Sequence, residues 1–149
     1  MTEIDHPIFS QSIQYIRERI DCPHLNDLEK QVLERIIHST GDFSIRDHLV
    51  FSKDACSFGR TCLQKGAPIL TDTFMAASAV RPMASRTLGS SVYCVLDWAP
   101  QEEQTGLTRT AIGLENAWID LTSKCSNENK PLVLFGSAPK ALEVLLGLI

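Results

Sequence analysis

A short apolar run that closes with polar residues, GAPILTDT at positions 66–73, constrains the fold of this chain more than any other stretch. Pro68 is tolerated only at the first residues of a strand, so Ile69 and Leu70 form the buried part. The run therefore predicts a short buried strand whose carboxyl end, Thr71-Asp72-Thr73, leads into a helix. In an open parallel α/β sheet, ligands bind outside this end of the strands, beside helix N-termini.

Helical patterns come before this strand. Apolar residues at helical spacing predict one amphipathic helix over about residues 9–20 and a second from Asn26, which pairs with Glu29 as in a capping box, to His38. A short strand is predicted over 49–51, followed by a helix that Ser52 caps and that ends near residue 64. Gly59 within that helix costs about 1 kcal/mol relative to alanine, which suggests close packing there.

Helix and strand patterns continue to alternate after the central strand. The predicted elements are a helical turn at 75–77, a loop at 81–90 that either contacts a ligand or is simply exposed, a strand at 91–96, a helix at 110–125, a polar turn at 127–131, a strand at 132–135 and a last helix that starts at 136–139. This alternation predicts an α/β fold with a mostly parallel sheet covered on both faces.

Length, composition and charge limit the class of protein. With 149 residues, 44% of them hydrophobic and 21% charged, the chain suits one globular domain over 1–149. The net charge of −4 argues against a nucleic-acid binder. Five cysteines without CxxC or Cys/His zinc spacing indicate reduced thiols, most of them buried, in a cytoplasmic protein without a metal centre. We expect no signal peptide and no membrane span.

Three turns each follow a strand or a loop and open a helix. They are Thr71-Asp72-Thr73, Thr108-Arg109-Thr110 and Gly136-Ser137-Ala138-Pro139. If they share one edge of the sheet, they gather N–H groups, hydroxyls and a guanidinium around one concavity, which suits carboxylate or phosphate groups. GxGxxG and GxxxxGK[ST] are both absent, and a Ser-His-Asp triad lacks the GxSxG signature.

His38 allows two readings. A histidine in the last turn of a helix is a favourable partner for the helix dipole. The same residue adjoins an apolar stripe and a glycine stop, a position that could hold an imidazole over a pocket.

Five motifs together resemble the precorrin-8X methylmutase (precorrin isomerase) family of corrin biosynthesis. They occur in the family's order with similar spacing, and no single one would be specific. The matching segments are DHPIFSQSIQYIRERI (5–20), HSTGD (38–42), GAPILTDTFM (66–75), TRTAIG (108–113) and GSAPKAL (136–142).

The resemblance implies a three-layer α/β/α, flavodoxin-like domain that forms a homodimer or a higher oligomer, with a tetrapyrrole pocket at the subunit interface. The implied reaction is an intramolecular methyl migration on precorrin-8X or its cobalt form, giving hydrogenobyrinate or cobyrinate. It uses neither a redox cofactor nor a catalytic metal. The family's catalytic histidine corresponds to His38, the general acid that protonates a ring nitrogen, a task that suits an imidazole.

The resemblance also implies the substrate-binding residues. Ser12 matches a pocket serine, Arg109 matches an arginine that meets an acidic side chain of the ring, and Thr71 and Thr73 flank the equivalent strand end. We add Asp72 and Ser137 to this set. His38 and Arg109 are then expected to converge on a cleft that holds a large flat acidic macrocycle.

The chain departs from the family pattern at three positions, with Ala79 for glycine, Ser137 for asparagine and Lys140 for threonine. Members of the family continue through a further strand, so this chain resembles a C-terminally shortened member that lacks the last strand. The alternative to an active isomerase is a catalytically inactive shortened homologue that binds a tetrapyrrole or a partner protein.

Overall fold

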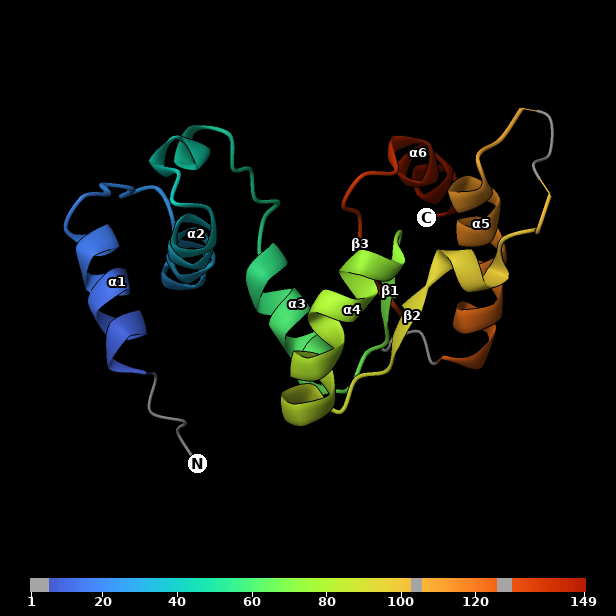
Figure 1. Ribbon diagram of the computed structural model, residues 1–149, viewed down its shortest axis with the longest axis horizontal. Coiled ribbons are helices and arrows are strands. Elements are labelled where there is room, and N and C mark those ends of the chain that lie inside the picture. The colour runs from blue at the N-terminus through green and yellow to red at the C-terminus, as the bar shows by residue number, and fades with distance from the viewer. Residues whose placement is uncertain (1–5, 103–105, 126–129) are drawn as a thin grey trace. The chain divides into compact units, whose positions relative to one another are not determined.

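The computed structural model describes residues 6–102, 106–125 and 130–149 (Figure 1). The chain divides into two compact units, Met1–Phe58 and Gly59–Ile149. The first unit is helical, and the second contains the β-sheet. The single domain expected from the chain length stays a prediction.

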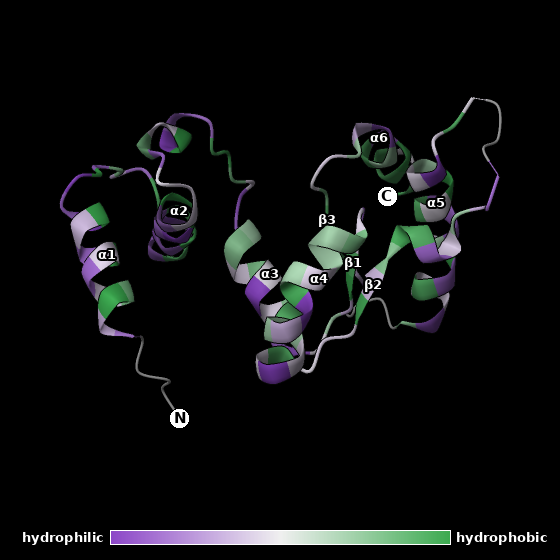
Figure 2. Cartoon of the chain, viewed as in Figure 1, coloured by the Kyte–Doolittle hydropathy of each residue, from purple (hydrophilic) through white to green (hydrophobic). Residues whose placement is uncertain are grey.

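The helical unit is built from a pair of packed helices. α1 spans Pro7–Arg17, α2 spans Asp27–Thr40, and a 3₁₀ turn, η1, follows at Phe43–Asp47. Hydrophilic and hydrophobic residues alternate along both helices, as in amphipathic helices (Figure 2). The two helices predicted over 9–20 and 26–38 are therefore confirmed. Their apolar faces meet in a core of Ile13, Ile16, Cys22, Leu33 and Ile37.

Local signals set the two ends of α2. The Asn26 side chain accepts hydrogen bonds from the N–H groups of Leu28 and Glu29 at 3.0 and 3.1 Å. The Glu29 carboxylate in turn accepts from the Asn26 N–H at 2.9 Å, which completes the predicted capping box. Gly41 ends the helix with a φ of 71°, a conformation that glycine adopts without steric cost. His38 consequently lies in the last turn.

An ion pair between an exposed arginine and a buried glutamate joins the two helices. Arg17 of α1 donates two hydrogen bonds to the Glu34 carboxylate of α2, at 2.7 and 2.8 Å. Glu34 is only 6% exposed, and this contact is the largest cause of a raised pKa for Arg17. The two parallel hydrogen bonds of this ion pair add a polar contact between α1 and α2 to their apolar packing.

The strand predicted over 49–51 is wrong. Residues 49–52 have no regular secondary structure, and the Val50 side chain is 89% exposed. Three residues with β-propensity make no strand unless a neighbour satisfies their backbone groups. The following helix, α3, spans Ala55–Gln64 and begins three residues after the predicted cap. Close packing at Gly59 is also wrong, because no described atom lies within 4 Å of the methyl that alanine would add.

The second unit contains a parallel sheet of three short strands. These are β1 (Ile69–Thr71), β2 (Val92–Cys94) and β3 (Leu132–Leu134), in the spatial order β2-β1-β3. In this register Thr71 pairs with Cys94 on one side and with Leu134 on the other. The carboxyl ends of the three strands therefore meet at one edge. The strands predicted from the apolar runs are confirmed, with shorter bounds.

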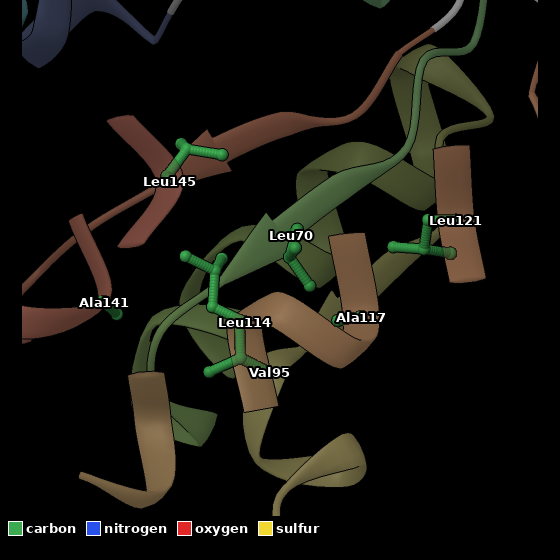
Figure 3. Close-up of a cluster of buried hydrophobic side chains, with 7 residues drawn as sticks. All are labelled: Leu70, Val95, Leu114, Ala117, Leu121, Ala141 and Leu145. Carbon is green, nitrogen blue, oxygen red and sulfur yellow. The ribbon is translucent and has the colours of Figure 1, made fainter. Parts of the chain in front are cut away.

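Helices cover both sides of this sheet. α4 (Phe74–Met83) lies on one side of β1 and β2, and α5 (Arg109–Lys124) lies on the other (Figure 1). α6 (Pro139–Leu148) packs against α5 and contributes to the same core. That core centres on Leu70 of β1 (Figure 3). The predicted α/β class, with a parallel sheet between helices, is confirmed. The remaining core residues are Val95, Leu114, Ala117, Leu121, Ala141 and Leu145.

The loop predicted over 81–90 is wrong. α4 continues through Pro82, and a π-helical turn, η2, follows at Ala84–Leu88 and ends at Gly89. Pro82 has no N–H and cannot donate to the carbonyl of Ser78, four residues earlier, yet the helix continues through it. Beyond Pro82, the Arg86 side chain donates to the Pro82 carbonyl at 3.1 Å and the Thr87 side chain to the Met83 carbonyl at 2.7 Å. The polar residues that suggested a loop, such as Arg81, Ser85 and Arg86, are exposed residues at the end of a helix.

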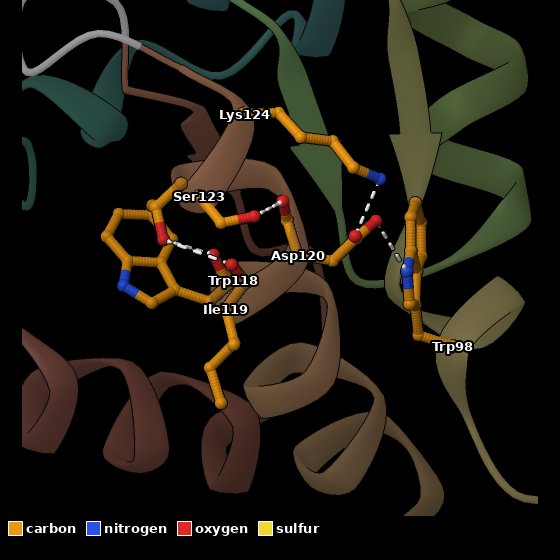
Figure 4. Close-up of polar contacts among 7 residues, drawn as sticks. Trp98, Trp118, Ile119, Asp120, Ser123 and Lys124 are labelled. Atoms are coloured by element: carbon orange, nitrogen blue, oxygen red, sulfur yellow. Dashed lines mark hydrogen bonds and ion pairs between the residues drawn. The ribbon is translucent and has the colours of Figure 1, made fainter.

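α5 is held against the 3₁₀ turn η3 (Val95–Trp98) by close packing and by polar contacts. A side chain at Gly113 would overlap the Val95 carbonyl oxygen, so the two backbones touch only because glycine is there. Asp120 accepts a hydrogen bond from the Trp98 indole at 3.3 Å and pairs with Lys124 at 2.6 Å (Figure 4). The hydrogen bond between Trp98 and Asp120 therefore holds η3, the turn that follows β2, against α5.

Two further predictions concern a polar turn and membrane-spanning helices. Most of the polar turn predicted at 127–131 lies outside the described residues. None of the helices in 6–102, 106–125 and 130–149 combines the length and the apolar character needed to cross a lipid bilayer.

Candidate active site

A serine and a histidine from different helices meet on the surface of the helical unit. Ser12 Oγ of α1 lies 2.7 Å from His38 Nδ1 of α2, although 26 positions separate the two residues in the sequence. Each is the chain neighbour of a core residue, Ile13 and Ile37, so packing of the two apolar faces brings the polar pair together. His38 is exposed and Ser12 is half-buried.

A ring contact holds the same imidazole from another side. The Phe9 and His38 rings pack in a T-shaped arrangement, with centroids 4.9 Å apart and an interplanar angle of 83°. The Arg35 guanidinium lies over the other ring, 4.7 Å from the Phe9 centroid. With Nδ1 bonded to Ser12, His38 Nε2 is left without a hydrogen-bond partner among the described residues. This nitrogen is available to exchange a proton with a ligand.

Phe9 and Arg35 were missed as part of this cluster. They precede Ser12 and His38 by three positions on their respective helices, and residues three apart lie on the same helical face. That spacing was the available signal. It shows which side chains share a face but does not show which helix faces the other.

In the sheet unit, a carboxylate occupies the N-terminal end of α6. Asp72 Oδ2 accepts hydrogen bonds from the N–H groups of Gly136, Ser137 and Ala138 at 2.8, 2.7 and 3.0 Å. Asp72 is fully buried, and its Oδ1 has no partner in the described part of the chain. The anion that this helix end attracts is thus supplied by the protein itself. A role for Asp72 or Ser137 in substrate binding stays a prediction.

The two threonines beside Asp72 also bond to the backbone. The Thr71 hydroxyl donates to the carbonyls of Thr73 and Tyr93, at 3.0 and 3.1 Å. The Thr73 hydroxyl caps α4 by accepting from the Ala76 N–H at 3.2 Å. Burial raises the pKa of the Cys94 thiol next to Thr71, which favours its neutral form. At the end of β1, Thr71, Asp72 and Thr73 therefore all bond to the protein's own backbone, and Asp72 Oδ1 is the oxygen left without a partner in the described residues.

The turn that carries Arg109 is separate from these contacts. Thr108 caps α5 by accepting from the Ala111 N–H at 3.3 Å. The exposed Arg109 donates through Nε to the Pro100 carbonyl at 3.0 Å. Of the three predicted turns, the structure joins the first and the third through Asp72, and it bonds the second to residue 100. Because His38 and Arg109 belong to different units, their convergence on one cleft stays a prediction.

All five cysteines are free thiols, and Cys22, Cys62 and Cys94 are buried. This agrees with the reduced, mostly buried thiols expected from the sequence. In the described residues, no three or more His, Cys, Asp or Glu side chains form a group that could hold a metal ion.

Comparison with known proteins identifies the family. Residues 7–149 match the family model described as CbiC, precorrin-8X methylmutase. The chain belongs to the precorrin-8X methylmutase family. The match covers almost the whole chain, as the five motifs indicated, so the resemblance inferred from them is confirmed.

Relatives of known name support the same assignment. The chain is 35% identical over 135 residues to the cobalt-precorrin-8 methylmutase of Salmonella typhimurium (strain LT2), covering 88% of this chain and 61% of that protein. It is 34% identical over 150 residues to the precorrin-8X methylmutase of Pseudomonas aeruginosa, covering 95% and 66%. A cobalt-precorrin-8 methylmutase of Leptospira interrogans is 26% identical, with 95% and 64% covered. The chain therefore spans about two thirds of the length of these relatives.

A solved structure extends the agreement to three dimensions. The precorrin-8x methyl mutase of Thermus thermophilus superposes on this chain with a TM-score of 0.77 at 26% sequence identity. The superposition covers 95% of this chain and 66% of that one. The α/β fold is therefore the fold of the family.

Proposed function

We propose that this protein is an isomerase of cobalamin biosynthesis that moves a methyl group within precorrin-8X or its cobalt form, with His38 as the general acid. The observation that carries the proposal is the contact between Ser12 Oγ and His38 Nδ1, found in a chain of this family. It holds an exposed imidazole in one orientation and leaves Nε2 open. An acid–base group needs both features.

The residues of the helical unit supply the proton in this proposal. Nε2 of the imidazolium transfers its proton to a nitrogen of the tetrapyrrole, which makes the conjugated ring a better acceptor for the methyl group. The bond from the methyl to one ring carbon breaks as the bond to the neighbouring carbon forms. Since the product is an isomer of the substrate, the proton returns and His38 is regenerated.

The substrate-binding set remains Ser12, Thr71, Asp72, Thr73, Arg109 and Ser137 in this proposal. Thr73, Arg109 and Ser137 meet the substrate directly, whereas Ser12 acts through His38 and the fully buried Thr71 and Asp72 act through their bonds to the backbone. The exposed guanidinium of Arg109 supports it, because such a group can meet a ring carboxylate. We further propose that the protein works in the cytoplasm as a homodimer or higher oligomer. The five free thiols support a reducing compartment.

The test compares His38→Gln with His24→Gln, which removes an exposed histidine outside the pair. We expect His38→Gln to lose about 10²- to 10⁴-fold of the isomerisation rate with precorrin-8X, because general acid catalysis contributes about that factor. Product binding, followed by visible absorbance, is expected to survive. Full turnover by His38→Gln would remove this residue from the mechanism. Binding of the product without any turnover by the wild-type chain would favour the inactive homologue instead.

A further inference from the structure

We infer that Ser12 is a positioning residue that orients the His38 imidazole through Nδ1 and makes Nε2 the nitrogen that exchanges the proton. The effect of Ser12 on catalysis depends on the proposed function. The orientation itself does not, because it follows from contacts within the helical unit.

The geometry leaves the ring little freedom. The separation of 2.7 Å between Ser12 Oγ and His38 Nδ1 is that of a good hydrogen bond. The Phe9 ring packs against the imidazole in a T-shaped arrangement, with 4.9 Å between centroids. The hydrogen bond holds Nδ1 of the imidazole toward Ser12, and the contact with Phe9 restricts rotation of the imidazole plane. An exposed histidine in a last helical turn, without these two contacts, would sample several rotamers.

A hydroxyl suits this position because it can donate or accept. In the imidazolium, Nδ1–H donates to Ser12 Oγ. After Nε2–H has given its proton to a ring nitrogen, the electron pair stays on Nε2, and Nδ1–H still donates to the same oxygen. The hydrogen bond therefore survives the transfer and the return of the proton without any movement of Ser12.

This role differs from that of a substrate contact. A serine that binds the macrocycle directly would mainly change the KM when truncated, whereas a residue that orients the acid changes kcat. A misplacement of about 1 Å at a reacting group can cost about 100-fold in rate. We therefore expect Ser12→Ala to lower kcat by about 10- to 100-fold with the KM nearly unchanged.

The chain offers matched variants for the experiment. Ser12→Thr keeps a hydroxyl on the same carbon. Ser10→Ala removes a hydroxyl from the same exposed helix, one that makes no hydrogen bond in the described part of the chain. Alanine is the best helix former, so both alanine variants are expected to keep α1 folded.

The first measurement is 15N NMR of the histidine ring nitrogens in the full chain, at a pH where the imidazoles are neutral, with His38 assigned from His38→Gln. We expect Ser12→Ala to shift the Nδ1 resonance and the tautomer ratio of His38 and to leave His6, His24 and His48 unchanged. Ser12→Thr and Ser10→Ala should match the wild type. Unchanged His38 resonances in Ser12→Ala would overturn the inference.

The second measurement is steady-state kinetics with precorrin-8X. A raised KM with an unchanged kcat in Ser12→Ala would overturn the positioning role and make Ser12 a substrate contact. If the wild type shows no turnover, the proposed function fails, but the NMR measurement still decides whether Ser12 orients His38.

Discussion

The two units of this chain use their polar side chains in opposite ways. In the sheet unit, Thr71 and Asp72 are fully buried and bond to the protein's own backbone. In the helical unit, the Ser12–His38 pair lies at the surface and leaves one ring nitrogen open. Buried polar groups with internal partners stabilise a fold, whereas an exposed group with an open donor can act on another molecule. We therefore look for chemistry at His38 and for stability at Asp72.

The largest stability effect is expected at Asp72. Asp72→Ala removes three charge-assisted hydrogen bonds and leaves the N–H groups of residues 136–138 without their acceptor. We expect a loss of about 3 kcal/mol or more in the free energy of unfolding, measured by urea denaturation. Asp72→Asn keeps one oxygen but no charge, so its loss should be intermediate.

Ser137→Ala is the control for this prediction, because the Ser137 backbone N–H bonds to Asp72 while its side chain is exposed. It should change stability by less than about 0.5 kcal/mol. Equal effects of Asp72→Ala and Ser137→Ala would contradict the stabilising role assigned to the Asp72 carboxylate.

An intermediate effect is expected from Gly113→Ala. The added methyl would overlap the Val95 carbonyl, and a backbone atom cannot move aside as a side-chain end can. We expect a loss of about 2 kcal/mol in thermal or urea unfolding. Gly59→Ala in α3 is the matched control, since the same change there meets no described atom within 4 Å. It should stabilise the protein by up to about 1 kcal/mol. An unchanged free energy of unfolding in Gly113→Ala would show that α5 and η3 can move apart without loss of stability.

The smallest effect concerns Asp120 and acid pH. The hydrogen bond from Lys124 is the largest cause of a lowered pKa for Asp120. Burial opposes it, and the charge of Lys124 and the hydrogen bond from Trp98 lower the pKa further. A carboxyl with a lowered folded pKa adds stability above its unfolded pKa of about 3.9 and loses it as the pH falls through the folded value. Asp120→Asn should therefore be slightly less stable than wild type at pH 7, and the two should converge below about pH 3. If Asp120→Asn remains less stable than wild type below about pH 3, the contribution of Asp120 to stability comes from packing and not from its charge.

The sequence predicted most of the elements that depend on local periodicity. The capping box at Asn26, the strand at Ile69 and the helix that opens at Arg109 all stand where the pattern placed them. The failures at 49–51 and 81–90 have one cause in common. Composition alone does not show that a strand requires a partner, nor that α4 can continue through Pro82, which removes only one of its backbone donors.

The candidate site was less predictable than the fold. The motifs identified His38, Ser12 and Arg109 through the family resemblance, and physical reasoning placed Asp72 at a strand end beside helix N-termini. That Asp72 itself fills the end of α6 could not be inferred, because the three N–H groups lie 64 to 66 positions away in the chain. Phe9 and Arg35 gave no signal beyond their spacing.

By itself, the sequence determined the amphipathic helices, the three strands of the sheet, the caps at Asn26 and Thr108 and membership of the precorrin-8X methylmutase family. These properties depend on residues a few positions apart or on motifs that retain their order. Only the tertiary structure decided which polar groups meet. Packing of the apolar faces of α1 and α2 brought Ser12 to His38, and the sheet register carried Asp72 to the start of α6. Contacts between distant residues depend on how whole elements pack, and no local pattern records that.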